Sequence, residues 1–269
     1  MFDAIRTAVV PLFKGRPRDP IPGHPCLSLQ GLSKSFGGLD AVSGLDLQVM
    51  PGDRKGIIGP NGAGKTTLFN LITGVFPVTS GKVVLFGHDA TKWASYDRVH
   101  LGMSRTFQVT NLFPKLSVMD NLLLATQGLR AMKLAMWRFQ SSYGELHGKC
   151  RELLEKVGFW DRRDVEIRHL SHGEQRQIEI VLGLATEPRL LLLDEPAAGL
   201  STGESHEMAA FLNNLDPELA ILMIEHDMDV AFAVVNTIAV LHYGELIEEG
   251  TTEQIRASEK VQKIYLGVD

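Results

Sequence analysis

The sequence predicts an α/β fold built on a mostly parallel β-sheet. Two unbroken apolar runs, residues 190–193 and 220–224, are each followed by acidic residues. Such runs are typical of parallel strands that are covered on both faces. A glycine-rich segment, residues 59–66, stands between a short apolar run and helix-like residues. Because parallel sheets bind ligands at the carboxyl ends of their strands, the polar residues that follow these runs form the candidate site.

The first part of the chain predicts a tail followed by strands. Four prolines in residues 16–25 indicate a linker, so residues 1–25 are expected to be a flexible tail and the domain to occupy residues 26–269. Alternating apolar residues predict strands at residues 27–32 and 45–49. Phe36 stands beside two glycines, where an aromatic ring either packs in the core or stacks on an adenine.

Residues 59–66 read GPNGAGKT and match the phosphate-loop pattern G-x-x-x-x-G-K-[ST] at every required position. Glycines let successive N–H groups point at phosphate oxygens, and the following helix adds its positive end. Lys65 is then expected to reach the β- and γ-phosphates, and the Thr66 hydroxyl to bind Mg2+. The alternative is an ordinary glycine-rich turn, but a strand before and a helix after favour the phosphate loop. The residues expected at the nucleotide are Gly59, Asn61, Gly62, Ala63, Gly64, Lys65, Thr66 and Thr67.

The middle of the chain predicts helices. Residues 82–87 read as one more strand, and then residues 117–158 are rich in Leu and Met with few β-branched residues. A second helix is expected over residues 171–186, and Ser171 with Glu174 forms a capping box at its start. The box accounts for the pattern on structural grounds alone, yet the same helix end also suits an anion such as a terminal phosphate. We expect a helical insert over approximately residues 110–186.

Three of the polar residues that follow the two apolar runs have an expected role at the nucleotide. Asp194 is expected to orient Mg2+ through water, and Glu195 to polarise the attacking water as the general base. His226 follows residues 220–224 and would contact the γ-phosphate. The alternative for Asp194 and Glu195 is simple solvation at a strand end, and for His226 it is a satisfied polar residue without a role in catalysis. A hairpin about Gly244 and a last helix over residues 251–265 complete the chain.

The composition narrows the class of protein. A net charge of -5 and a pI near 6.0 argue against nucleic acid as the main partner. Cys26 and Cys150 provide no disulfide framework, which fits a reducing compartment. No stretch reaches the ~18–20 apolar residues needed to cross a bilayer, and Pro11 interrupts the apolar patch near the start, which argues against a cleaved signal peptide.

Taken in order, these motifs resemble the ATP-binding subunits of ABC transporters over residues 27–267. The resemblance implies a P-loop NTPase cassette with a mostly parallel core sheet, an antiparallel β-subdomain and an inserted α-helical subdomain. It identifies Phe36 as the aromatic that stacks on adenine, and Gln108 as the glutamine that links Mg2+ to the membrane domain. Residues 170–175 would be the signature sequence that contacts ATP on the opposite subunit through Ser171, Gly173 and Glu174. The catalytic residues would be Glu195, His226 and Lys65, and the metal-binding residues Thr66, Gln108 and Asp194.

Within that family, residues 102–113 resemble the ATPases of branched-chain, or hydrophobic, amino-acid importers. The resemblance implies ATP and Mg2+ as cofactors and a homodimer or a heterodimer with a homologous ATPase subunit. It also implies transmembrane permease subunits, indirectly a periplasmic solute-binding protein, and a peripheral position on the cytoplasmic face of the inner (plasma) membrane. The alternatives are the ATPase of a lipid or lipopolysaccharide exporter, whose ending is similar, and an ABC ATPase acting on nucleic acid or ribosomes.

Two positions depart from the family pattern. His172 stands where the signature sequence usually has glycine, and Ser201 stands where the loop after the second acidic motif usually has aspartate. Neither departure removes a group that does chemistry, so we expect ATP hydrolysis to be retained.

Overall fold

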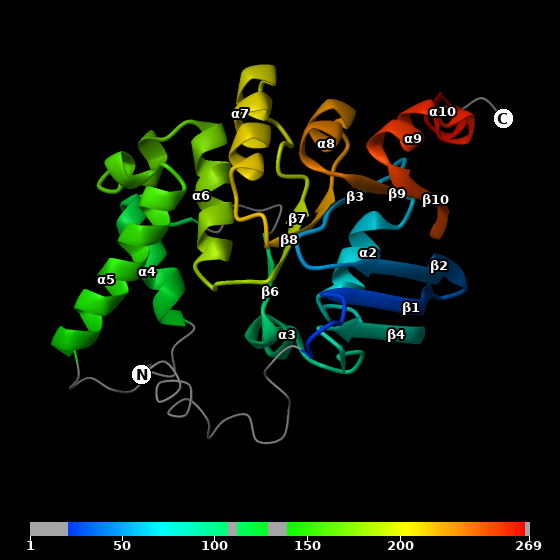
Figure 1. Ribbon diagram of the computed structural model, residues 1–269, viewed down its shortest axis with the longest axis horizontal. Helices are drawn as coiled ribbons and strands as arrows, with labels where there is room; N and C mark the ends of the chain where they lie inside the picture. Colours follow the sequence, from blue (N-terminus) through cyan, green and yellow to red (C-terminus); the bar gives the residue numbers. More distant parts are fainter. Residues whose placement is uncertain (1–20, 107–111, 129–138, 267–269) are drawn as a thin grey trace. The chain divides into compact units, whose positions relative to one another are not determined.

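The computed structural model describes residues 21–106, 112–128 and 139–266 of the 269-residue chain. The chain divides into two compact units. The core unit combines Asp19–Thr110 with Pro188–Asp269, and the helical unit is built on Asn111–Glu187. Each unit has its own elements, which Figure 1 labels along the chain.

A six-stranded sheet forms the centre of the core unit, in the order β10-β9-β3-β8-β7-β6. The five strands from β9 to β6 run parallel, and β10 pairs antiparallel with β9. All residues of β7 and β8 are buried, as expected for strands covered on both faces. The predicted parallel sheet is therefore confirmed. Its strands are β3 (Arg54–Ile58), β6 (Met103–Arg105), β7 (Leu190–Asp194), β8 (Ala220–Ile224), β9 (Thr237–His242) and β10 (Glu245–Thr251).

The core unit also holds a four-stranded antiparallel sheet, in the order β2-β1-β4-β5. Leu27 pairs with Val49, and both are buried in a core shared with residues of the six-stranded sheet. The expected antiparallel subdomain is thus present, although its second strand begins at Leu39, six residues before the predicted start. The strands are β1 (Leu27–Phe36), β2 (Leu39–Val49), β4 (Ser80–Leu85) and β5 (His88–Asp89).

Helices complete the core unit, and one prediction about them is wrong. The single helix expected over residues 251–265 is two helices, because Ser258 has an extended backbone and its Oγ accepts a hydrogen bond from Val261 N at 3.3 Å. A serine in this role begins a new helix. The helices are α2 (Lys65–Ile72), α3 (Ser95–Leu101), α7 (Thr202–Asn213), α8 (Met228–Val234), α9 (Thr252–Ala257) and α10 (Glu259–Leu266).

In the helical unit, α4 packs against α5 and α6, burying Leu122, Leu154 and Ile178. The helical stretch predicted over residues 117–158 is α4 and α5, and residues 129–138 between them lie outside the described part of the chain. The elements are α4 (Val118–Gly128), α5 (Phe139–Lys156), the 3-10 helices η3 (Trp160–Arg162) and η4 (Ile167–His169), and α6 (His172–Leu184).

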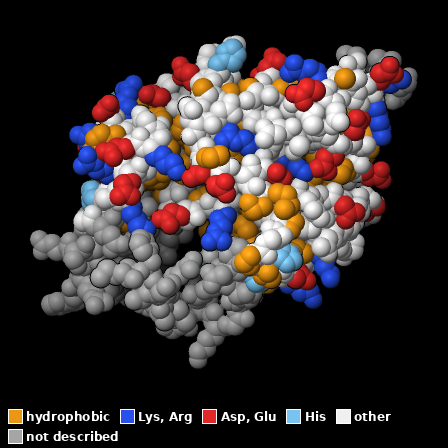
Figure 2. Space-filling model, in the orientation of Figure 1, with side chains coloured by type: hydrophobic (Ala, Val, Ile, Leu, Met, Phe, Trp, Pro, Cys, Tyr) orange, Lys and Arg blue, Asp and Glu red, His pale blue; other side chains and the backbone are white. Residues whose placement is uncertain are grey.

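Two surface properties bear on function. Among the described helices, none combines the length and apolar character that a membrane span requires. On the face seen in Figure 2, acidic and basic side chains are interspersed rather than gathered by sign, in keeping with the mildly acidic net charge.

Candidate functional site

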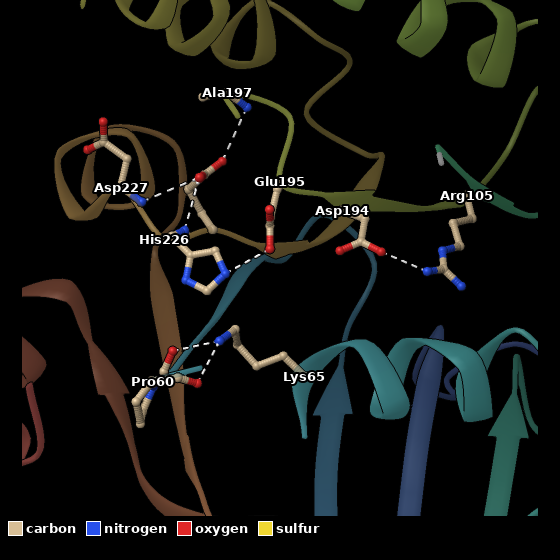
Figure 3. A network of polar contacts seen from close by, with 10 residues as sticks. Pro60, Lys65, Arg105, Asp194, Glu195, Ala197, His226 and Asp227 are labelled. Carbon is tan, nitrogen blue, oxygen red and sulfur yellow. Dashed lines mark hydrogen bonds and ion pairs between the residues drawn. The ribbon is translucent and has the colours of Figure 1, made fainter. Parts of the chain in front are cut away.

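The carboxyl ends of four neighbouring strands meet at one edge of the core sheet. Since β3, β8, β7 and β6 are parallel, the residues that follow them lie at the same edge. Strand β3 leads into the glycine-rich loop, β8 into His226, and β7 ends at Asp194, while β6 ends at Arg105. Figure 3 shows these side chains around one space. The predicted convergence of Lys65, Asp194, Glu195 and His226 is observed.

The glycine-rich loop needs glycine at two positions. A Cβ atom on Gly59 would lie 2.2 Å from the Leu241 carbonyl oxygen. Gly64 is the N-cap of α2 with φ of 100°, and its Cβ would lie 2.2 Å from the Ala41 carbonyl oxygen. No side chain caps α2. The first N–H groups of this helix therefore point into the loop without a side-chain acceptor, the arrangement that suits phosphate oxygens.

Lys65 bends back over the loop. Its side chain is buried, and Nζ donates hydrogen bonds to the carbonyl oxygens of Gly59 at 2.6 Å and Pro60 at 3.0 Å. Burial lowers the pKa of Lys65, whereas the negative charges of Glu195 and Asp194 act in the opposite direction. The lysine is thus a desolvated cation beside two carboxylates, and phosphate oxygens could replace its carbonyl partners.

Glu195 and His226 form a close pair. His226 Nε2 lies 2.7 Å from Glu195 Oε1. Glu195 has φ of 50°, a left-handed conformation that is uncommon for a residue with a side chain, and its N–H donates to Ile224 O at 2.9 Å. Strain of this kind occurs where a structure aims a functional side chain. The bend after β7 directs the Glu195 carboxylate toward the imidazole that follows β8.

Asp194, the residue before Glu195, forms an ion pair with a residue that the sequence analysis missed. Arg105 Nη2 lies 2.7 Å from Asp194 Oδ2, and both side chains are at least 92% buried, with exposures of 8% and 2%. The two residues are 89 positions apart in the sequence. Arg105 ends β6, the strand that pairs with β7, so the two side chains are neighbours at adjacent strand ends, and the sequence analysis had not predicted this short strand.

Glu225 is a second residue to which the sequence analysis assigned no role. This carboxylate is 3% exposed and accepts hydrogen bonds from the N–H groups of His226 at 3.0 Å, Asp227 at 3.4 Å and Ala197 at 3.3 Å. Burial raises the pKa of Glu225, those hydrogen bonds lower it, and the nearby charge of Glu195 raises it further. Glu225 thereby links the loop after β7 to the loop after β8.

Phe36 and the remaining loop residues differ in how far they are exposed. Phe36 is 44% exposed, packs edge-on against Phe76 at 5.6 Å and carries Lys34 Nζ 4.8 Å from its ring centre. A half-exposed ring is available for stacking on a base. Asn61, Gly62 and Thr66 are exposed, Gly64 and Thr67 are half-buried, and Ala63 is buried.

In the helical unit, the predicted capping box at the start of α6 is present. Ser171 N donates to Glu174 Oε2 at 2.8 Å, and Glu174 N donates to Ser171 Oγ at 3.1 Å. Arg162 Nη2 lies 3.0 Å from Glu174 Oε1. Gly173 is buried, while His172 in place of the usual glycine is exposed.

Gln108 lies outside the described residues. Ser201, which replaces the usual aspartate, is the N-cap of α7 and forms a capping box with Glu204. A serine at this position therefore has a local structural reason.

Two protein oxygens at this edge could hold a cation together with phosphate oxygens. Within the described residues, no group of three or more His, Cys, Asp or Glu is placed to hold a metal. The available donors are the exposed Thr66 hydroxyl and Asp194 Oδ1, which is buried and has no hydrogen-bond partner among those residues. Mg2+ is usually bound by only one or two protein oxygens, and the substrate phosphates and water molecules supply its other ligands.

Comparisons with known proteins agree with this geometry. Residues 42–198 match the family model described as "ABC transporter". The chain is 36% identical to the high-affinity branched-chain amino acid transport ATP-binding protein LivG of Escherichia coli K12, over 91% of this chain and 98% of that protein. The corresponding protein BraF of Pseudomonas aeruginosa is also 36% identical over the same shares.

Among solved structures, the ADP conformation of MJ1267, an ATP-binding cassette of an ABC transporter, has a TM-score of 0.80 and 29% identity. The match covers 90% of this chain and 99% of that one. The dimeric cassette MJ0796 shares the fold, with a TM-score of 0.68 at 23% identity and a match covering 84% of this chain and 98% of that one. The chain carries an ATP-binding cassette and belongs to the ABC transporter family.

Proposed function

We propose that this chain is the ATP-binding and ATP-hydrolysing subunit of an importer for branched-chain or other hydrophobic amino acids. Family membership supports the ATPase activity. Support for the solute class comes from LivG and BraF, which are named for high-affinity branched-chain amino acid transport and are matched over 98% of their lengths. Residues 102–113, which carry the resemblance to the ATPases of branched-chain amino-acid importers, lie within that match.

One observation carries the catalytic assignment, namely the 2.7 Å contact of Glu195 with His226 beside the phosphate loop. In the proposed reaction, Glu195 accepts a proton from a water molecule whose oxygen attacks the γ-phosphorus. The bond from that phosphorus to the bridging oxygen breaks, and ADP leaves with the electron pair. His226 orients the Glu195 carboxylate and contacts the γ-phosphate. The products are ADP and inorganic phosphate.

The loop and the acidic edge would hold the substrate. Lys65 binds the β- and γ-phosphates, and the N–H groups at the start of α2 bind the same oxygens. Thr66 and Asp194 would hold Mg2+, Asp194 through water, and Gln108 is expected to join them. When bound, Mg2+ neutralises charge on the β- and γ-phosphate oxygens. Phe36 stacks on the adenine through its exposed face.

The partners follow from the same assignment. Two cassettes, identical or homologous, would each offer Ser171, Gly173 and Glu174 to the ATP bound by the other. The pair would work on transmembrane permease subunits at the cytoplasmic face of the inner membrane, with a periplasmic binding protein supplying the solute. The dimeric form of the cassette MJ0796, which shares the fold, supports the pairing.

The decisive test of the catalytic role is Glu195→Gln. Because the amide keeps the shape but cannot accept the proton, ATP hydrolysis should fall by roughly 10²–10⁴-fold. ATP binding should be retained, so the variant should accumulate as an ATP-dependent dimer in size-exclusion chromatography. Glu207→Gln, a change at an exposed position of α7, is the matched control and should hydrolyse ATP normally. Hydrolysis near the wild-type rate in Glu195→Gln would refute the assignment.

A test of the solute class requires the membrane partners. Reconstituted with its permease and binding protein, the ATPase should be stimulated by leucine, isoleucine or valine and not by a charged amino acid such as lysine. Stimulation by a lipid in the absence of any binding protein would instead favour the exporter alternative.

A further inference from the structure

The two acidic residues at the end of β7 each contact a basic side chain. Asp194 pairs with Arg105, and Glu195 pairs with His226. The phosphate-loop lysine, Lys65, instead donates to the carbonyl oxygens of Gly59 and Pro60. In Figure 3 the two oxygens of Asp194 point apart, one to Arg105 and the other toward the side where Glu195 lies.

A different pairing, in which Lys65 neutralises Asp194, would also be favourable electrostatically. Asp194 and Glu195 are near enough for their negative charges to act on Lys65. A buried carboxylate without a partner is costly and draws in any cation within reach. Without Arg105, the flexible ammonium of Lys65 is the cation that could neutralise Asp194, which would remove it from the phosphate-binding position.

Several contacts hold Arg105 beside Asp194. Its Nη1 donates to Asn70 Oδ1 at 2.7 Å and to Thr73 Oγ1 at 3.3 Å, and its guanidinium lies 5.6 Å from the centre of the Phe69 ring. These three partners belong to α2 or its C-cap, the same helix that begins with Lys65. A planar guanidinium with several fixed donors is well suited to hold one carboxylate oxygen in place.

We propose that Arg105 is a positioning residue that occupies Asp194 and thereby keeps Lys65 available for the phosphates of the nucleotide. The role is electrostatic and does not require contact between Arg105 and ATP. It rests on the proposed nucleotide-binding function of the loop. It adds a residue on β6 to the set that determines nucleotide affinity.

The test measures ADP affinity by calorimetry in EDTA, so that Mg2+ and hydrolysis play no part. Arg105→Met should weaken ADP binding by about tenfold or more, the order expected when one charge-assisted contact is lost. Asp194→Asn in the same chain should restore the affinity to within about threefold of wild type, because Lys65 then has no carboxylate to neutralise at Asp194. Arg105→Lys, which keeps the charge, should stay near wild type.

Arg54→Met is the matched control for the loss of a partly buried arginine. Arg54 lies at the amino end of β3, away from the loop, and donates to the Leu212 carbonyl at 2.9 Å. This variant should keep wild-type ADP affinity. An unchanged affinity in Arg105→Met, or no recovery in the double variant, would overturn the proposal. A wild-type protein that binds ADP neither with nor without Mg2+ would instead overturn the proposed function.

Discussion

Helices α2 and α6 both begin at residues proposed to meet nucleotide phosphates, yet their N-termini are built in opposite ways. Helix α2 starts after Gly64, which has a left-handed conformation and provides no side-chain cap. Helix α6 starts after Ser171, where a complete capping box with Glu174 uses both side chains. The first helix start leaves its N–H groups for a ligand, whereas the second has satisfied part of its own donors.

The difference shows what a capping box can and cannot indicate. The same box occurs at the start of α7, through Ser201, and at the start of α9, through Thr251. A box therefore marks the start of a helix and not a binding site. By contrast, an uncapped N-terminus after a glycine loop, at the carboxyl end of a parallel strand, is the arrangement that binds anions. We expect changes at the α2 start to affect nucleotide binding most.

The largest effect should come from Gly64→Ala. The added Cβ would lie 2.2 Å from the Ala41 carbonyl oxygen, and φ of 100° is strained for alanine. Relief of that strain must move the loop, and strain of this kind costs about 1–3 kcal/mol. Nucleotide affinity, measured by fluorescence titration, should fall by up to about a hundredfold.

Gly203→Ala provides the contrast for that experiment. An added Cβ on Gly203 meets no atom within 4 Å, and the residue lies inside α7. Alanine is favoured over glycine in a helix by roughly 0.5–1 kcal/mol, so the thermal midpoint should stay or rise, with unchanged nucleotide affinity. Normal nucleotide binding by Gly64→Ala would show that the loop does not depend on this conformation.

Sequence reasoning succeeded where one local pattern determines position. The unbroken apolar stretch before Asp194 and the one before His226 predict buried parallel strands, and parallel strands bring their ends together whatever the distance in sequence. The capping box at Ser171 is a short-range pattern of the same kind, and it is observed as predicted. The predicted chemistry of these residues stays a prediction.

Sequence reasoning failed where the role of a residue depends on contacts with residues that are distant in the sequence or on local backbone geometry. Arg105 is the last residue of a strand of only three residues, and nothing in the sequence near it indicates that Asp194 is its partner. The role of Glu225 depends on the N–H of Ala197, which comes from a different strand end. The sequence does not distinguish Ser258 from a serine inside a helix, and only the hydrogen bond from Val261 N to its Oγ shows that α10 begins there. In each case the tertiary contact, and not local propensity, defines the role.

A smaller effect is expected from Ser171→Ala. Loss of the Oγ acceptor for Glu174 N removes a cap, which costs about 1 kcal/mol of helix stability. The affinity of the monomer for nucleotide should be unchanged, while the ATP-dependent dimer of Glu195→Gln should weaken by roughly fivefold to tenfold. Thr251→Ala removes an equivalent cap from α9. If both variants weakened the dimer equally, helix stability alone would explain the result.

The smallest effect should come from Glu174→Gln. The direction of the change in dimer affinity distinguishes a role of Glu174 in ATP binding from its role in capping α6. The amide oxygen can still accept from Ser171 N, so the box is kept, and the lost pair with Arg162 is a surface contact with side-chain exposures of 52% and 23%. Such pairs are worth about 0–1 kcal/mol, so stability should barely change. If ATP phosphates meet this helix start, removal of a negative charge there should tighten the ATP-dependent dimer of Glu195→Gln by about threefold.

Arg162→Gln, which leaves the Glu174 charge unpaired, should weaken the same dimer. Sedimentation velocity with ATP measures both, and equal dimer affinities in the two variants would show that no phosphate approaches α6.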